Sequence, residues 1–85
     1  MPVTKPILER AARALCRHAG NPENPKFEGR PMWESYLPDA RAVLEAITEP
    51  DMEMISAAAD KAKEIGAGDF VGIWRAMIGA AVTHP

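Results

Sequence analysis

The chain has 85 residues, of which 47% are hydrophobic, and its formal net charge is −2. This length allows one core built from the pooled apolar faces of several helices but not two cores, so we predict a single small domain over residues 1–85. The slightly negative net charge argues against a protein that coats nucleic acid. The lone Cys16 excludes an intramolecular disulfide framework and is typical of a reducing compartment.

A first helix is predicted over residues 5–19. Its apolar residues recur at spacings of three and four, as they do on one face of a helix. These residues are Ile7, Leu8, Ala11, Ala12 and Leu15. Thr4 is the expected N-cap, Pro6 suits the first turn, and Gly20 suits a left-handed C-terminal cap.

The same helix carries a basic stripe of Arg10, Arg13 and Arg17, which are also three and four residues apart. A solvated outer face is the simplest interpretation, and Glu9 is placed to pair with Arg13 at i,i+4. The alternative is a contact with phosphate groups or with an acidic partner. These three arginines are then the candidate site residues.

Residues 20–31, with the sequence GNPENPKFEGRP, are predicted to form the longest loop. Their Pro, Asn and Gly content favours neither a continuous helix nor a strand. A loop of about a dozen residues in a small domain either carries function or is held by a buried side chain. We favour the second interpretation, with Phe27 as the buried side chain.

The densest apolar pattern runs from residue 33 to residue 47 and indicates a helix, which we predict over residues 35–48. Its positions step by three and four: Trp33, Tyr36, Leu37, Ala40, Val43, Leu44 and Ile47. Ser35 is the expected N-cap with Pro38 in the first turn, and a kink at Pro38 is the alternative. Pro50 ends the helix because it disfavours the helical conformation of the residue before it.

Two more helices are predicted over residues 51–65 and 69–82, with Asp51 and Asp69 as N-caps and a break at residues 66–68. Both have apolar residues at helical spacing. These are Met52, Ile55, Ala58, Ala59, Ala62 and Ile65 in the first, and Phe70, Ile73, Trp74, Met77, Ile78 and Ala81 in the second. The last helix contains glycines that cost roughly 1 kcal/mol each against alanine, so packing must stabilise it.

The aromatic residues and methionines are assigned to the core, because so short a chain needs its large side chains there. The exception is the segment of Met32, Trp33 and Tyr36, which precedes the regular part of the helix over residues 35–48. Aromatic side chains that stay partly exposed there would mark a surface for a partner.

No catalytic or metal-binding constellation is recognisable. Cys16 and His18 point to different faces of one helix, and no Asp or Asn is placed to orient His18. His84 is far from His18, without HxxxH or CxxC spacing. The sequence GAGD at residues 66–69 follows a helix, whereas a nucleotide-binding loop follows a strand. We therefore predict no enzyme activity, no metal and no cofactor.

The N-terminal sequence MPVTKPILER lacks the long apolar run and small-residue cleavage site of a signal peptide. No segment approaches the roughly 20 apolar residues that span a bilayer. We therefore expect a cytoplasmic protein that does not contact a membrane.

Three segments carry a resemblance to known proteins: ILERAARAL at the start, W..Y...ARAVLEAI..EP in the middle and WRAMIGAA near the end. Together they are similar to a set of small uncharacterised proteins of bacteria, often associated with phages or prophages. The resemblance is strongest at residues 41–47 and 74–78. It implies a bacterial or phage origin and a compact helical domain, and it brings no established activity.

We expect an all-α fold, a compact bundle of about four short helices. Its predicted core comprises Leu15, Leu44, Ile47, Ile55, Ile73, Trp74 and Met77. Residues 1–30 carry six Lys and Arg against three acids, and residues 31–85 carry four against nine, which favours contact within or between chains.

The favoured function is therefore a non-enzymatic protein–protein interaction or accessory module that can self-associate. The alternative is a small accessory protein that binds DNA or RNA through the basic face of the first helix, with Lys26 and Arg30 as further phosphate contacts. Such binding would weaken steeply with salt.

Overall fold

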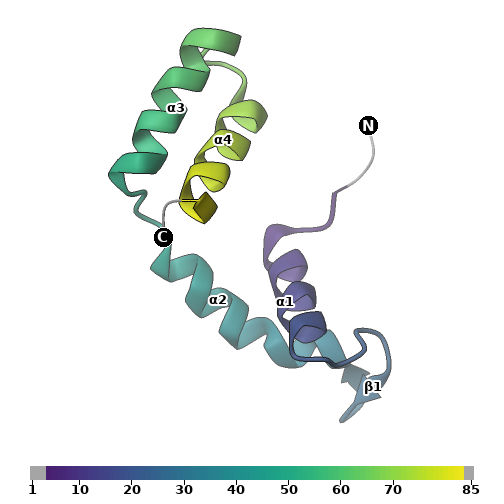
Figure 1. Cartoon of the computed structure of the whole chain (residues 1–85). Helices are drawn as coiled ribbons and strands as arrows, with labels where there is room; N and C mark the ends of the chain where they lie inside the picture. Colours follow the sequence, from purple (N-terminus) through teal and green to yellow (C-terminus); the bar gives the residue numbers. More distant parts are fainter. Residues whose placement is uncertain (1–3, 84–85) are drawn as a thin grey trace. The chain divides into compact units, whose positions relative to one another are not determined.

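A computed structural model of the protein describes residues 4–83 and shows an all-α fold with four helices, as predicted (Figure 1). The elements in chain order are α1 (Ile7–His18), β1 (Lys26–Phe27), β2 (Arg30–Pro31), the 3-10 helix η1 (Met32–Tyr36), α2 (Leu37–Ala46), α3 (Met52–Ile65) and α4 (Phe70–Thr83). The chain divides into two compact units, Met1–Thr48 and Glu49–Pro85. The single domain over residues 1–85 stays a prediction.

The first helix, α1, begins later than the sequence indicates. Pro6 directly precedes it with φ −53° and ψ 146°, and no side chain caps it, so the predicted Thr4 cap is wrong. The extended backbone of Pro6 places its carbonyl to accept the Arg10 N–H at 3.0 Å. A helix that starts directly after Pro6 leaves Thr4 too far out to cap it.

The end of α1 agrees with the prediction. Gly20 has φ +86°, in the left-handed region that glycine adopts without steric cost. The Asn21 N–H donates to the Cys16 carbonyl at 3.1 Å, and the Gly20 N–H donates to the Arg17 carbonyl at 2.9 Å. These two bonds form a Schellman motif and satisfy carbonyls that the helix leaves unpaired.

The second helix, α2, follows η1 without a break. Tyr36 precedes α2, and Pro38 lies in its first turn, where its missing N–H costs nothing. The prediction that Pro38 starts the helix is confirmed, whereas the Ser35 cap is wrong because Ser35 already lies within η1. The helix ends at Ala46, two residues earlier than predicted.

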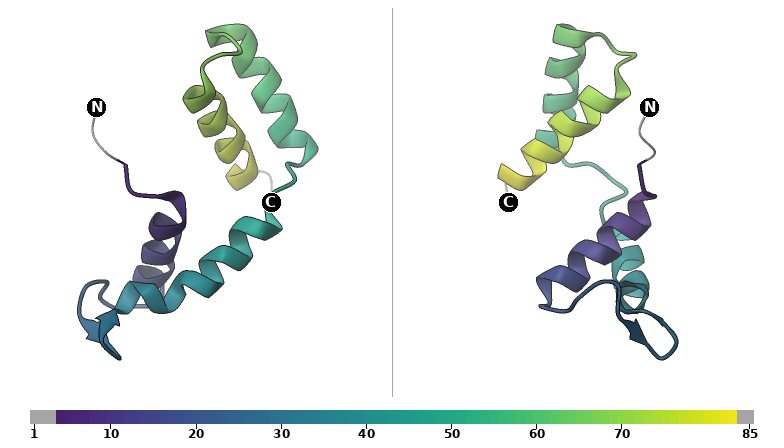
Figure 2. Two further views of the ribbon diagram at one scale, coloured as in Figure 1. Left: turned by 180° about the vertical axis from the view of Figure 1, so that it is seen from behind. Right: turned by 90° about the vertical axis from the view of Figure 1, so that its right-hand side faces the viewer.

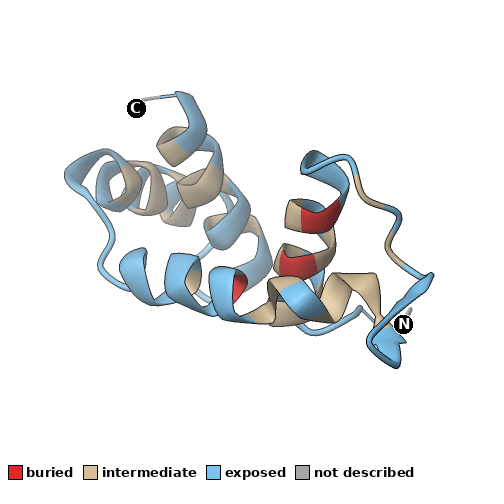
Figure 3. Ribbon diagram, turned by 90° about the horizontal axis from the view of Figure 1, so that it is seen from below, coloured by how far each residue is buried: buried red, intermediate tan, exposed pale blue. Residues whose placement is uncertain are grey.

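The centre of the first unit lies between α1 and α2. Ala12 and Cys16 of α1 and Ala40 of α2 are fully buried (Figure 3). Their small side chains allow the two helices to approach closely. Of the predicted core residues, Leu15 and Leu44 are half-buried, whereas Ile47 is exposed.

The second unit is an αα-hairpin in which α3 and α4 lie side by side (Figure 2). Both predicted caps are confirmed, because Asp51 Oδ1 accepts the Met54 N–H at 2.9 Å and Asp69 Oδ1 accepts the Gly72 N–H at 3.0 Å. Gly66, with φ +95°, ends α3 and begins the short connection.

The face that α3 turns inward agrees with the predicted one at Ala58 and Ala62 and differs from it at the large residues. The half-buried residues of α3 are Met54, Ala57, Ala58, Lys61 and Ala62. Met52 and Ile55, which were predicted to be buried, are exposed. Small residues determine which face of α3 lies inward, because the alanines of α3 and Gly72 of α4 permit close packing. A Cβ at Gly72 would collide with the Ile65 side chain. Neither α3 nor α4 contains a fully buried residue.

Candidate functional site

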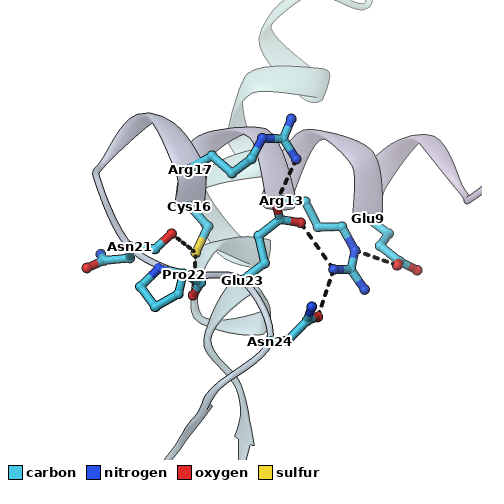
Figure 4. Close-up of polar contacts among 8 residues, drawn as sticks. All are labelled: Glu9, Arg13, Cys16, Arg17, Asn21, Pro22, Glu23 and Asn24. Atoms are coloured by element: carbon cyan, nitrogen blue, oxygen red, sulfur yellow. Dashed lines mark hydrogen bonds and ion pairs between the residues drawn. The ribbon is translucent and has the colours of Figure 1, made fainter.

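Two arginines of the basic stripe of α1, Arg13 and Arg17, are engaged with the loop that follows the helix (Figure 4). Arg13 Nε donates to Glu9 Oε2 at 2.8 Å, which confirms the predicted i,i+4 pair. Its Nη1 donates to Glu23 Oε1 at 3.1 Å and to Asn24 Oδ1 at 3.2 Å. The guanidinium carbon also lies 4.7 Å from the centroid of the Trp33 ring. One arginine thus joins α1, the loop and η1.

Glu23 receives two arginines. Its Oε1 is paired with Arg13, and its Oε2 accepts from Arg17 Nη1 at 2.9 Å. These hydrogen bonds, first from Arg17 and then from Arg13, lower the pKa of Glu23, against the opposing effect of partial burial. The pKa of Arg13 is raised, chiefly by its hydrogen bond to Glu9. The network therefore favours the charged forms of both groups.

Further hydrogen bonds hold the loop. Asn21 Nδ2 donates to the Tyr36 hydroxyl at 2.6 Å. The Met32 N–H donates to the Pro25 carbonyl at 2.9 Å, and the Trp33 N–H donates to the Glu23 carbonyl at 3.1 Å. Trp33 and Tyr36 are half-buried. Both make contacts inside the first unit, Trp33 with Arg13 and Tyr36 with Asn21.

The interpretation of Phe27 as a buried tether is wrong, because its side chain is 50% exposed. Phe27 belongs to a small antiparallel hairpin in which Lys26 pairs with Pro31 and Phe27 with Arg30. The turn residues Glu28 and Gly29 have φ +52° and +80°. Positive φ at both central residues is typical of the tight turns that join two strands. The hairpin was not predicted, because the composition of residues 20–31 favoured neither a continuous helix nor a strand.

The two arginines other than Arg13 remain more accessible. Lys5, Arg10, Arg13 and Arg17 together line one surface hollow. Arg10 Nε donates to the Lys5 carbonyl at 3.1 Å, and the Arg17 side chain is 59% exposed. The structure thus brings the three predicted arginines to one surface and adds Lys5, a basic residue just before α1 whose nearness in the sequence was the available signal. Glu9 and Glu23 offset part of its positive charge.

Cys16 and His18 are not brought together. Cys16 is buried, with Sγ 3.5 Å from both the Asn21 and Pro22 carbonyl oxygens, whereas His18 is exposed. Within residues 4–83, no group of three or more His, Cys, Asp or Glu side chains is arranged to hold a metal ion. His84 lies outside the described residues.

The largest apolar exposure is on α4. This helix carries a single charged residue, Arg75, and is otherwise apolar or small around its circumference. A helix of that kind is normally covered on all sides. Its outer face, on the side away from α3, is formed by large side chains that are 43% to 77% exposed. They are Phe70, Val71, Trp74 and Val82.

No family model, curated protein or solved structure matches the chain. In the part of the chain that the structure describes, no helix has the length and apolar character to cross a membrane. Two surfaces are therefore candidates on geometry alone: the outer face of α4 and the basic hollow on α1.

Proposed function

We propose that the protein is a non-enzymatic protein–protein interaction module whose partner binds the outer face of α4. The observation that carries this proposal is the exposure of Phe70 and Val82 at 77% and 74%, on a helix with only one charge. Burying apolar surface is favourable by roughly 25 cal/mol per Å² before the costs of association, so covering this face favours a complex. Trp74, also exposed there, is of the residue type most enriched in binding hot spots.

The cytoplasmic location and the bacterial or phage origin are part of this proposal. The first is supported by the single thiol of Cys16, which is free and buried. The second depends on the resemblance at residues 41–47 and 74–78. An accessory role in such a setting requires a binding surface and no reaction chemistry.

The test is site-specific photo-crosslinking in cells that express the protein. A photoreactive amino acid replaces Val71 on the outer face of α4, and in the control it replaces Glu45 on the exposed side of α2. We expect covalent protein adducts from position 71 and none from position 45. Equal labelling from both positions, or none from position 71, would refute the proposal.

We propose nucleic-acid binding as a second candidate, supported by the hollow lined with Lys5, Arg10, Arg13 and Arg17. Arg13 is excluded from the test because it holds the loop. A titration with labelled duplex and single strands at low salt should show binding that weakens as salt rises, and Arg10→Ala with Arg17→Ala should abolish it. Arg41→Ala on α2 is the control. Absence of binding at low salt would eliminate this candidate.

A further inference from the structure

We infer that the outer face of α4 is covered by a second copy of this chain, which packs antiparallel along a seam of Val71, Trp74, Ile78 and Ala81. The inference rests on the proposed function and names its partner. Three properties of the hairpin support it: the spacing of the seam, its symmetry and the area that it leaves uncovered.

The spacing of the seam is that of helix–helix pairing. Val71, Trp74, Ile78 and Ala81 follow one another at intervals of three, four and three. This is the a/d pattern of a coiled coil, in which each side chain inserts between four residues of the facing helix. The seam contains no charge, and the only charged residue of α4, Arg75, lies beside it.

The seam is also complementary to itself. Val71 and Ala81 lie five residues before and after the level of Ala76, and Trp74 and Ile78 lie two residues before and after it. When two copies pair antiparallel about this level, Trp74 meets Ile78 of the partner subunit, Phe70 comes level with Val82 of the partner subunit, and the same contacts repeat on the other side of the axis. A two-fold interface has this property, because every contact occurs twice. The large side chains that are exposed here each find an apolar neighbour.

The four large exposed side chains supply a little over half of the area that a standard dimer interface takes from each partner. With aromatic residues carrying about 150–250 Å² each, the exposed parts of Phe70, Val71, Trp74 and Val82 amount to roughly 450 Å². A standard interface takes about 800 Å² per partner, flanking side chains and main chain included. Residues 49–85 are also fewer than the roughly 40 below which a unit usually needs a disulfide, a metal or oligomerisation. A second α3–α4 hairpin supplies the missing cover.

The first experiment measures the mass of the purified protein by light scattering from low to high micromolar concentration. We expect the mass of two chains at the upper end. Val71→Glu and Val82→Glu should remain monomeric there, whereas Val43→Glu, the same change at an exposed position of α2, should remain dimeric. Circular dichroism of each variant checks that the helices are retained.

A second experiment tests the orientation, using single cysteines in a Cys16→Ser background. Trp74→Cys and Ile78→Cys face each other across the antiparallel seam, so an equimolar mixture of these two variants should form a disulfide-linked dimer on oxidation. Val82→Cys lies about 18 Å along the helix axis from its counterpart in an antiparallel pair, at 1.5 Å per residue, and should not form one. Glu53→Cys on α3 is the control for random collision.

A mass of one chain at every concentration would overturn the inference, as would dimers of Val71→Glu and Val82→Glu equal to those of the unchanged protein. A disulfide through Val82→Cys would overturn the antiparallel arrangement. If the protein is monomeric and position 71 crosslinks to a different protein, the proposed function stands and the second copy fails. If position 71 crosslinks to nothing, both fail.

Discussion

Arg13 joins three parts of the first unit through one side chain. Its planar guanidinium donates to Glu9 and Glu23 and stacks near Trp33. A lysine at this position would keep the charge but lose the fork of donors and the stacking surface. We expect Arg13→Lys to lower the melting temperature, and Arg17→Lys, at a more exposed arginine, to lower it less. Thermal unfolding followed by circular dichroism measures both, and equal effects would contradict the central role of Arg13.

The ion pairs of Glu23 with Arg13 and Arg17 make the first unit sensitive to acid. The pKa of Glu23 is lowered from its ordinary value of 4.5, so its ion pairs contribute stability above that pH, and this contribution is lost as pH falls through the lowered pKa. We expect denaturant unfolding to show a loss of stability below about pH 4.5, where unfolded glutamate begins to bind protons. Glu23→Gln should lose less over the same range. The same acid dependence in both proteins would assign the effect to other carboxylates.

The hydrogen bond between Asn21 and Tyr36 is short, at 2.6 Å, and joins the start of the loop to η1. Tyr36→Phe removes the acceptor and leaves the Asn21 amide without it. We expect a loss of about 0.5–1.5 kcal/mol in the free energy of unfolding. Ser35→Ala, at the exposed neighbouring position, should leave it nearly unchanged, and urea titration of both variants provides the comparison.

At the scale of single elements, α4 contains two glycines in different surroundings. Nothing lies within 4 Å of a Cβ added at Gly79, whereas a Cβ at Gly72 would collide with the Ile65 side chain of α3. We expect Gly79→Ala to stabilise the protein by about 0.8–1 kcal/mol through helix propensity. Gly72→Ala should gain less or destabilise, because Ile65 must turn out of its contact with α4.

Chemical denaturation measures both glycine variants in the same buffer. Circular dichroism at matched concentration shows whether each remains helical. An equal gain from Gly72→Ala would mean that Ile65 moves aside without cost, and that the approach of the two helices does not depend on a glycine.

The existence of the four helices was predictable from apolar spacing, and the caps Asp51 and Asp69 from their residue types. The rotation of α3 was not predictable, because large residues such as Met52 and Ile55 dominate the sequence pattern while alanines make the contact. At the site, three arginines were identified, but not Glu23, which lies ten residues from Arg13 in a loop without periodicity.

At the scale of the whole molecule, the dimer that we propose through α4 links stability to concentration. Binding of a second copy to the folded state, and not to the unfolded state, raises the melting temperature as protein concentration rises. We expect this dependence in the unchanged protein and a constant melting temperature in Val71→Glu. Differential scanning calorimetry over a hundredfold range of concentration measures it, and a constant value for both proteins would argue against the dimer.

The burial of Cys16 also makes its thiol a probe of local opening in the first unit. Cys16 is the only thiol in the sequence, and its sulfur is covered by the Asn21 and Pro22 carbonyls of the loop. A thiol reagent reaches the sulfur only after α1 and the loop separate, so the labelling rate reports how often that separation occurs. The opening of one unit is thereby timed without any engineered probe.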